Sequence, residues 1–553
     1  MIRSVECCGL EPILGTAKDH DGNTTFGEDA NRVETSICGL VRRWRHNASA
    51  PIFKLPPEVL NLIFELIVNP DHLTQDPGRP HPYQQLNISH TCSRWRQLAL
   101  GSTNLWTHIT LNASQCWVET LLDRSQQAPL IVEVDLQCPH IRDFSPVWAQ
   151  IPRIRRLSVM ATSRFNFYDP APQHLCVEAI LPNIPVVAEL LESFTLLASG
   201  YVVSAYLPES IFAAGTPRLR QLELQNCDFD INSPFLTGIT SFMLTSKLEI
   251  SSSQQIVDAL GSMPNLEILY LEESIPSFHD TVHPPSQECI PIDKRKPLQQ
   301  LTQLSVINAR VADCLHILNY FTFPTLSTTK LVLEGTRDAS ELETLASTVS
   351  RLVNDEGLGT RRPFHHLDAW CNFSWRVELE AWNMKPTDAS NESPPFCLWA
   401  TLPGHRPADI CNTLVGILPL EDLHVLRVHD FGVIDWSMFR RLRSLHCLST
   451  SEFNSDAGLL QALSMENPLT PQLAMGVQKD QLSILYFPSL RELKVQGWDY
   501  NEERDMLLRS VLVKRKDSYI PIMKLTLILC DISSAQEQGL SEIVEEVVVE
   551  HQV

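Results

Sequence analysis

Large apolar residues fill almost every position of the stretch FKLPPEVLNLIFELIV, residues 53–68. Pro56 and Pro57 suit the start of a helix, because the first turn does not use the missing N–H and needs the φ that proline sets. Only Asn61 and Glu65 interrupt the apolar run that follows, and their four-residue spacing places them on one stripe. The pattern predicts a helix that is apolar on more than one side. Such a helix needs more than one neighbour to cover it.

A different apolar pattern recurs from residue 151 onwards. The spacing P-x-L-x-x-L-x-L, with Ile or Val also allowed at the aliphatic positions, occurs at residues 152–159, 217–224, 264–271 and 488–495. Weaker copies lie at residues 239–244, 301–306, 364–369, 423–428 and 522–527. Three copies continue to Cys227, Asn372 or Cys530, as in L-x-x-L-x-L-x-x-N/C. This is the strand and turn of a leucine-rich repeat.

Helical stretches come before several of these copies, for example SQQIVDALGSM before Pro264 and DCLHILNYFTF before Pro324. A unit of helix, proline and strand cannot bury its own apolar face, so the units must stack. We therefore predict an α/β chain whose residues 151–532 form an irregular leucine-rich-repeat solenoid, with a parallel sheet on the concave face. Its exposed strand positions would be Arg155, Arg220, Gln221, Glu223, Tyr270 and Arg491.

The remaining segments complete the predicted organisation. Residues 1–50 are weakly periodic and indicate a flexible leader. Residues 51–112 form a compact helical unit with a second helical pattern over 86–100 and a third apolar piece over 105–111, and residues 113–150 connect it to the repeats. Residues 276–297 and 383–395 are predicted surface loops. The acidic tail 533–553 is expected to be an amphipathic helix that caps the array, or a free tail.

Composition narrows the possible functions of this 553-residue chain. Its 44 basic and 65 acidic residues give a formal charge of −21, which argues against binding nucleic acid or an anionic membrane surface. The 15 cysteines form no C-x-x-C pair and indicate reduced thiols. Residues 179–207 are the most membrane-like, but they contain Pro182, Pro185, Glu189 and Glu192, so no span is expected. We expect the cytoplasm or the nucleus.

The sequence carries no persuasive catalytic or metal-binding motif. Nucleophile-elbow, phosphate-loop, dinucleotide and zinc-protease signatures are absent. His279 and His283 have a chelating spacing but lie among prolines. The cluster FHHLDAWCNF, which contains His365, His366, Asp368 and Cys371, falls in repeat register, where strand alternation would scatter these side chains to opposite faces. We expect no enzyme activity, no cofactor and no metal.

Residues 53–111 carry a resemblance to a known family. LPPEVL at residues 55–60, then Ile63 and Phe64, resembles the opening of an F-box. The match continues with HTCSRWRQLA at residues 90–99, then Leu105 and Trp106. The long loop at residues 69–85 is similar to that of F-box proteins from mushroom-forming fungi.

The resemblance implies an adaptor function. An F-box is a three-helix unit that binds the Skp-type linker subunit of a cullin–RING ubiquitin ligase, and the repeats would then hold an unknown protein substrate. The residues that it implies for the linker contact are Leu55, Pro56, Pro57, Glu58, Leu60, Ile63, Phe64, Trp95, Leu105 and Trp106. Two alternatives stay open: a repeat scaffold whose F-box serves another assembly, and an enzyme of unrecognised type.

Overall fold

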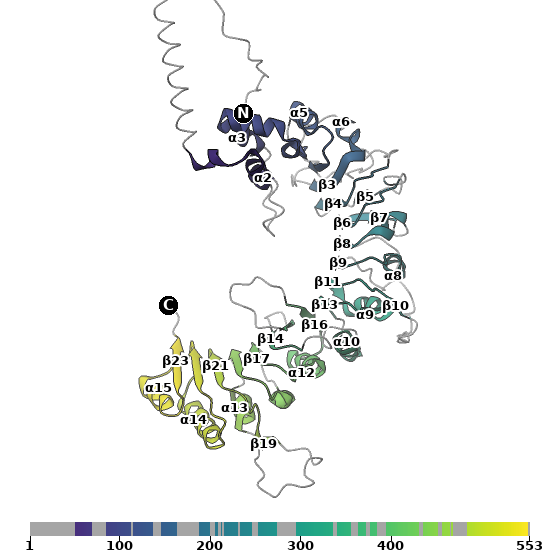
Figure 1. Cartoon of the computed structure of the whole chain (residues 1–553). Coiled ribbons are helices and arrows are strands. Elements are labelled where there is room, and N and C mark those ends of the chain that lie inside the picture. The colour runs from purple at the N-terminus through teal and green to yellow at the C-terminus, as the bar shows by residue number, and fades with distance from the viewer. Residues whose placement is uncertain are drawn as a thin grey trace, which may run out of the picture. The chain divides into compact units, whose positions relative to one another are not determined.

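The computed structural model of the chain (Figure 1) divides into two units, Met1–Leu105 and Trp106–Val553. The structure describes residues 50–68, 84–111, 114–135, 145–162, 187–199, 205–207, 212, 215–230, 233–245, 253–273, 295–335, 340–355, 363–371, 376–383, 394–430, 435–451, 456–464, 466–467 and 484–550. The predicted leader, most of both predicted surface loops, and His279 and His283 lie outside these residues.

Unit 1 is helical where it is described. Its elements are the 3₁₀ turn Pro51–Lys54 and the helices α2 (Pro57–Val68), α3 (Gln84–Thr91) and α4 (Ser93–Gly101). The single helix predicted over residues 86–100 was wrong. Cys92 adopts an extended conformation, and its Sγ accepts a hydrogen bond from the N–H of Trp95, so it caps a new helix instead of continuing the old one.

Unit 2 is built on one 17-stranded, mostly parallel sheet. Its strands are β1 (His108–Thr110), β2 (Leu130–Asp135), β3 (Ile154–Thr162), β4 (Ser193–Ser199), β6 (Gln221–Gln225), β8 (Ser241–Thr245), β9 (Ile268–Glu272), β11 (Gln303–Arg310), β13 (Thr328–Glu334), β14 (His366–Cys371), β15 (Val377–Trp382), β16 (Phe396–Thr401), β17 (Val425–His429), β18 (Cys447–Ser451), β21 (Glu492–Gln496), β22 (Lys524–Ile528) and β23 (Glu546–Glu550). The two-stranded pairs are β5 (Ala205–Leu207) with β7 (Cys227–Phe229), β10 (Lys296–Pro297) with β12 (Phe321–Thr322), and β19 (Glu466–Asn467) with β20 (Ile484–Leu485).

The helices of unit 2 lie along one face of the sheet (Figure 1). They are α5 (Gln115–Ser125), α6 (Ser145–Trp148), α8 (Ser253–Gly261), α9 (Val311–Tyr320), α10 (Ser340–Ser350), α12 (Pro407–Ile417), α13 (Asp456–Ser464), α14 (Glu502–Asp517) and α15 (Ser534–Ser541). Strand side chains alternate between buried positions and half-buried ones, as in β6, β9 and β17. We call the face that carries the half-buried positions the open face. None of the described helices is long and apolar enough to cross a membrane.

Successive strands are neighbours in the sheet except at one place. Between β13 and β17 the order along the sheet is β16, β15, β14, which reverses their order in the chain. β15 runs antiparallel to both of its neighbours, whereas β14 and β16 are parallel to β17 and β13. We call β14–β16 the reversed segment.

All nine copies of the L-x-x-L-x-L pattern form strands of this sheet, namely β3, β6, β8, β9, β11, β14, β17, β21 and β22. The two quoted helical stretches are α8 and α9. The helix expected over the whole acidic tail was wrong, because α15 ends at Ser541 and Glu546–Glu550 is a strand that pairs with β22. Three consecutive valines explain the strand, since β-branched side chains favour extended backbone.

Arginines join neighbouring helices in unit 2, three of them buried and Arg441 half-buried. Arg153, Arg351, Arg441 and Arg515 each donate hydrogen bonds to carbonyl oxygens at or just beyond the C-terminal end of an earlier helix, which is α5, α9, α12 or α13 respectively. The last carbonyls of a helix have no partner within the helix and carry negative partial charge, so a cation there is favourable. The same device therefore recurs at four places along the array.

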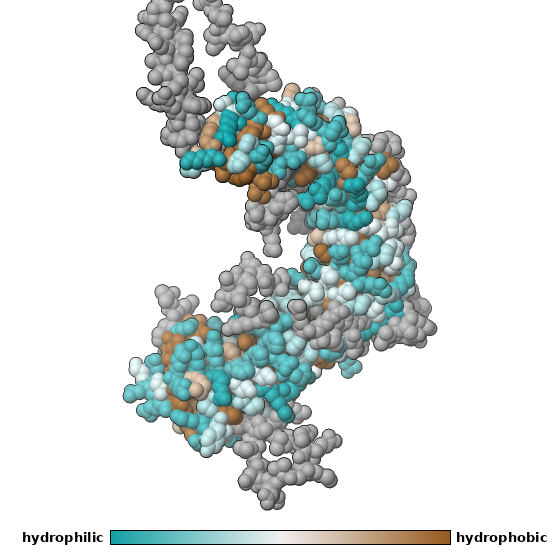
Figure 2. Space-filling view, viewed as in Figure 1, coloured by the Kyte–Doolittle hydropathy of each residue, from teal (hydrophilic) through white to brown (hydrophobic). Residues whose placement is uncertain are grey.

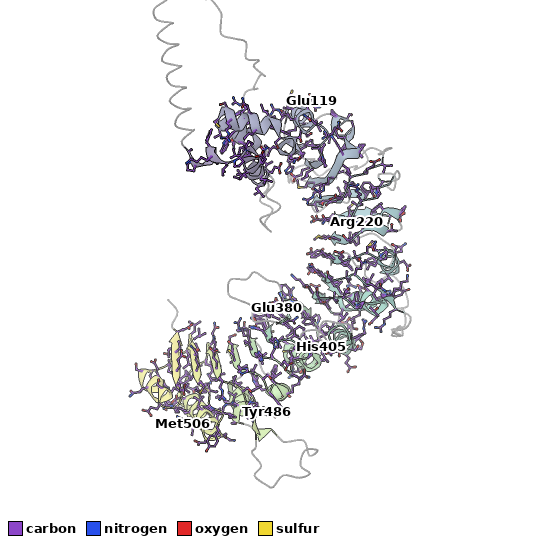
Figure 3. The ribbon with its side chains drawn as sticks, viewed as in Figure 1. Glu119, Arg220, Glu380, His405, Tyr486 and Met506 are labelled. Carbon is purple, nitrogen blue, oxygen red and sulfur yellow. The ribbon has the colours of Figure 1, made fainter. Side chains whose placement is uncertain are left out.

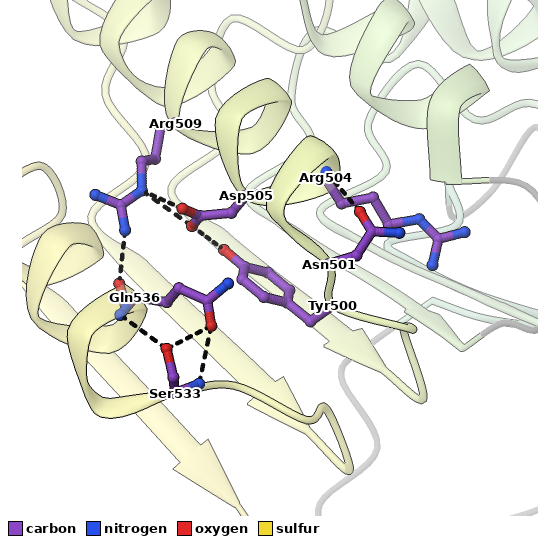
Figure 4. A network of polar contacts seen from close by, with 7 residues as sticks. All are labelled: Tyr500, Asn501, Arg504, Asp505, Arg509, Ser533 and Gln536. Carbon is purple, nitrogen blue, oxygen red and sulfur yellow. Dashed lines mark hydrogen bonds and ion pairs between the residues drawn. The ribbon is translucent and has the colours of Figure 1, made fainter.

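The last helices of the array are joined by a polar network (Figure 4). Asp505 on α14 accepts a hydrogen bond from the Tyr500 hydroxyl at 2.9 Å and one from Arg509 at 2.9 Å. Arg509 also donates to the backbone oxygen of Gln536 on α15, at 3.1 Å. Ser533 and Gln536 form a capping box at the start of α15. The network holds the final helix against the one before it.

Candidate partner-binding surface

Helix α2 is apolar on two opposite sides. Leu60, Phe64 and Val68, spaced four residues apart, are buried in unit 1. The Phe64 ring lies 4.9 Å from that of Trp95, centroid to centroid. This stripe forms the part of the core of unit 1 that α2 contributes, and it accounts for the apolar residues on one side of α2.

Other apolar residues of α2 are exposed. Val59, Leu62 and Leu66, at spacings of three and four, are 39%, 60% and 44% exposed, on the side of α2 opposite to the buried stripe. We call these three residues the exposed stripe. Figure 2 shows apolar surface gathered over α2. A contiguous apolar patch on a small unit is typical of a protein-binding site.

The segment before α2 is fixed by α4. The Arg94 guanidinium donates hydrogen bonds to the carbonyl oxygens of Phe53 and Leu55, and lies 5.5 Å from the centre of the Phe53 ring. Pro56 and Pro57 follow directly and are exposed beside the first turn of α2. Arg94 therefore fixes the backbone that leads into α2, next to the two exposed prolines.

The structure divides the ten predicted linker-contact residues into three groups. Pro56, Pro57 and Glu58 are exposed, whereas Leu55, Ile63 and Trp95 are half-buried. The fully buried members are Leu60, Phe64, Leu105 and Trp106. Trp106 belongs to unit 2, where the Arg124 guanidinium lies 4.4 Å from its ring centre. The contact role of all ten stays a prediction, and the four buried residues belong to the cores of the units.

The exposed stripe could have been found in the sequence. Val59, Leu62 and Leu66 repeat at helical spacing on the face that Leu60 and Phe64 leave free. Only Val59 of the three lies within the LPPEVL motif, so the family resemblance does not assign this stripe to the linker contact.

The positions that the sequence predicted to be exposed are polar, and they lie on the open face of unit 2 or at the edge of the sheet where the strands begin. Arg155, Arg220, Gln221 and Arg491 are exposed, and Glu223 and Tyr270 are half-buried. Neighbouring side chains at that edge interact: the Arg155 Nε lies 2.7 Å from a carboxylate oxygen of Glu192. Burial, together with a hydrogen bond to Glu272, raises the pKa of Tyr270 to about 12. The side chains at these positions include groups that can donate hydrogen bonds and groups that can accept them.

The reversed segment places tryptophans and charges on the open face. Trp370 stacks on His429 with ring centroids 5.7 Å apart, and Lys330 lies 5.1 Å from the ring centre of Trp399. Glu380 also lies on this face (Figure 3), and burial together with the nearby Asp368 raises its pKa. The reversed segment and the strands beside it therefore bring aromatic and ionisable groups together on the open face.

The cluster FHHLDAWCNF only partly follows the predicted scattering. Nε2 of the buried His366 lies 2.6 Å from the Asp368 carboxylate, because residues two apart share one face of a strand. Nδ1 of His365 lies 3.0 Å from the backbone oxygen of Asp422 instead. Burial raises the pKa of the Cys371 thiol. Over the described residues, no group of three or more His, Cys, Asp or Glu side chains is arranged to hold a metal ion.

Comparison with known proteins addresses unit 1 and the start of unit 2. A search of the curated proteins finds no match to the chain. A scan against protein-family models matches residues 52–112 to the F-box-like family. These residues include α2, α3, α4 and β1, and with them both stripes of α2. The chain therefore contains an F-box-like domain at residues 52–112, of the kind that mediates protein interaction.

Proposed function

We propose that this protein is a non-catalytic substrate-recognition adaptor of a Skp–cullin–F-box type ubiquitin ligase, acting in the cytoplasm or the nucleus. The F-box-like domain binds the Skp-type linker subunit, and unit 2 binds the protein that is to be ubiquitinated. The single observation that carries the proposal is the exposed stripe of α2 within the family-matched residues. The domain buries Leu60 and Phe64 and still leaves a second apolar surface without cover.

The linker contact combines the exposed stripe with the residues before it. Arg94 holds the oxygens of Phe53 and Leu55, so the segment that leads into α2 needs little ordering when a partner binds. Buried apolar anchors of this kind usually dominate binding energy, at about 2 kcal/mol or more for the strongest. Glu58 at the start of α2 would contribute at the rim of the contact.

Unit 2 is proposed to be an irregular leucine-rich-repeat solenoid. Three features support this: strands at the nine pattern positions, the recurring arginines at helix ends, and a residue with positive φ directly after several strands. Those residues include Asn226, Glu273, Asp430, Gly497 and Leu529. A similar turn after each strand is what a repeated unit requires. The sequence of residues 69–83, which lie outside the described residues, also suggests kinship with proteins of mushroom-forming fungi.

Co-purification with a Skp-type linker subunit tests the linker contact. Replacing Val59, Leu62 and Leu66 by serine should abolish capture, and so should Leu55→Ala with Pro56→Ala. The matched control replaces three exposed apolar residues of α14, namely Met506, Leu507 and Val513, by serine. Control and test variants remove similar exposed apolar groups from a helix. Capture that persists in the stripe variant, or that is lost equally in the control, refutes the assigned contact.

The half-life of captured partners separates the adaptor from a repeat scaffold that uses the F-box-like domain for another assembly. Partners recovered with the proteasome inhibited should become longer-lived in cells when the protein is removed. Unchanged half-lives for every partner would favour the scaffold.

A further inference from the structure

Three histidines from distant parts of the chain form a continuous row at the edge of the sheet where the strands begin. His365, His424 and His446 directly precede β14, β17 and β18. The N–H of His424 donates to the oxygen of His365, and the N–H of His446 donates to the oxygen of His424, both at 2.8 Å. Their ring centroids are 4.8 Å and 5.2 Å apart. We call these three residues the histidine row.

Arg491 extends the row by one position. Its backbone N–H donates to the oxygen of His446 at 2.9 Å, and its side chain is exposed before β21. His424 and His446 are exposed as well, and His365 is half-buried. The edge therefore offers three imidazoles and one guanidinium on four neighbouring strands. With strands about 4.8 Å apart, it spans about 15 Å, the length of four or five extended residues.

The surroundings of His424 favour its neutral imidazole in the absence of a ligand. Burial and the two neighbouring histidines lower the pKa of His424, and only Asp422 opposes them. Arg491 adds a permanent positive charge beyond His446. Glu421, on the same turn as Asp422, lies 3.9 Å from Arg441. A carboxylate added beside His424 would favour the protonated ring that these surroundings disfavour.

We propose that the histidine row together with Arg491 binds an acidic segment of a protein partner through its Asp and Glu carboxylates. Binding takes up protons, so it strengthens as the pH falls. A metal ion is the less suitable ligand, because the His365 and His424 rings are stacked with 15° between their planes. The proposal rests on the proposed function in one respect, that unit 2 is the part of the chain that holds the partner.

Peptide binding to the purified full-length chain tests the proposal. The probe is a fluorescent hexaglutamate peptide, with hexaglutamine as the neutral control, titrated at pH 6 and pH 8 and constant ionic strength. Hexaglutamate should bind more tightly at pH 6. His424→Gln and His446→Gln should each weaken binding at pH 6 by up to about fivefold, the range of an exposed ion pair. The double variant should lose most of the pH dependence. His405→Gln, away from the row in unit 2, should change neither.

Several outcomes would overturn the proposal. These are equal binding at the two pH values, an unchanged double variant, an equal loss in His405→Gln, and displacement of the peptide by millimolar inorganic phosphate, which would indicate a general anion site. Capture of the Skp-type linker subunit by the same histidine variants distinguishes failure of the adaptor proposal from failure of the histidine-row proposal. Peptide binding without linker capture refutes the adaptor assignment alone. Normal linker capture with no pH-dependent peptide binding refutes the row alone.

Discussion

Arg515 on α14 should be among the most costly positions to replace in unit 2. Its side chain is fully buried and donates to the backbone oxygens of Tyr486 and Phe487 at 2.8 Å each, and to that of Leu463 at 3.5 Å. Burial lowers the pKa of Arg515 to about 10, a sign that keeping the charge inside is expensive. The two short hydrogen bonds from a charged donor are worth about 3–6 kcal/mol together.

Arg515→Met sets these terms against each other. Methionine is apolar and flexible, so the substitution removes the free-energy cost of burying the charge. That cost is about 3 kcal/mol for the pKa change from 12.5 to about 10. The oxygen of Tyr486 loses the donor, whereas that of Phe487 still accepts from the N–H of Leu490 at 3.1 Å. Subtracting the regained 3 kcal/mol or so from the lost hydrogen bonding leaves a net loss of up to about 3 kcal/mol in unfolding free energy around α13 and β21. Arg515→Lys should lose less, because an ammonium still donates but lacks the planar fork.

Hydrogen exchange of the α13 and β21 amides measures this local stability, which a global melting curve of a long array would average. The control is Lys514→Met. Lys514 donates to the oxygen of Ser464 at the same helix end, but it is exposed, so its loss should cost under about 1 kcal/mol. Equal protection in the two variants would mean that burial cost and hydrogen bonding cancel at Arg515. The helix-end arginines would then contribute nothing to stability.

Three further predictions concern backbone and pH. Leu529 has φ 55° directly after β22, and Gly497 has φ 72° at the equivalent place after β21. In urea melts, Leu529→Gly should raise the unfolding free energy by about 1 kcal/mol and Gly497→Ala should lower it. Changes of the opposite sign would refute this. Gly539→Ala would push the flexible Arg509 guanidinium away from the oxygen of Gln536, so protection of α15 in hydrogen exchange should fall; equal or higher protection would contradict this. Burial lowers the pKa of His316, so the unfolded state binds more protons below about pH 6.5. Stability should fall there, and His316→Gln should reduce the fall.

The sequence predicted what depends on local periodicity. Residues such as Leu222 and Leu224 alternate with polar ones, and that alternation selects strand and buried face without any long-range information. The strand at Glu546–Glu550 was missed because glutamates at its ends and valines between them also suit a helix face. The histidine row could not be predicted, because bringing His365 beside His424 requires the reversed order of β14–β16.

The reversed segment has a consequence for how the sheet assembles. Elsewhere a new strand can add to the one before it: His429 and Ser451, which are in contact across β17 and β18, are 22 residues apart. Across β14 and β17, Asp368 and Arg427 are 59 residues apart. Closing that longer loop costs about 1 kcal/mol more in chain entropy. Strands β14, β15 and β16 must also join the sheet together. Of the three, only β16 pairs with β13, so β14 cannot be added after β13 until β16 and β15 are in place between them. Folding that spreads along unit 2 from either end should therefore pause at this point.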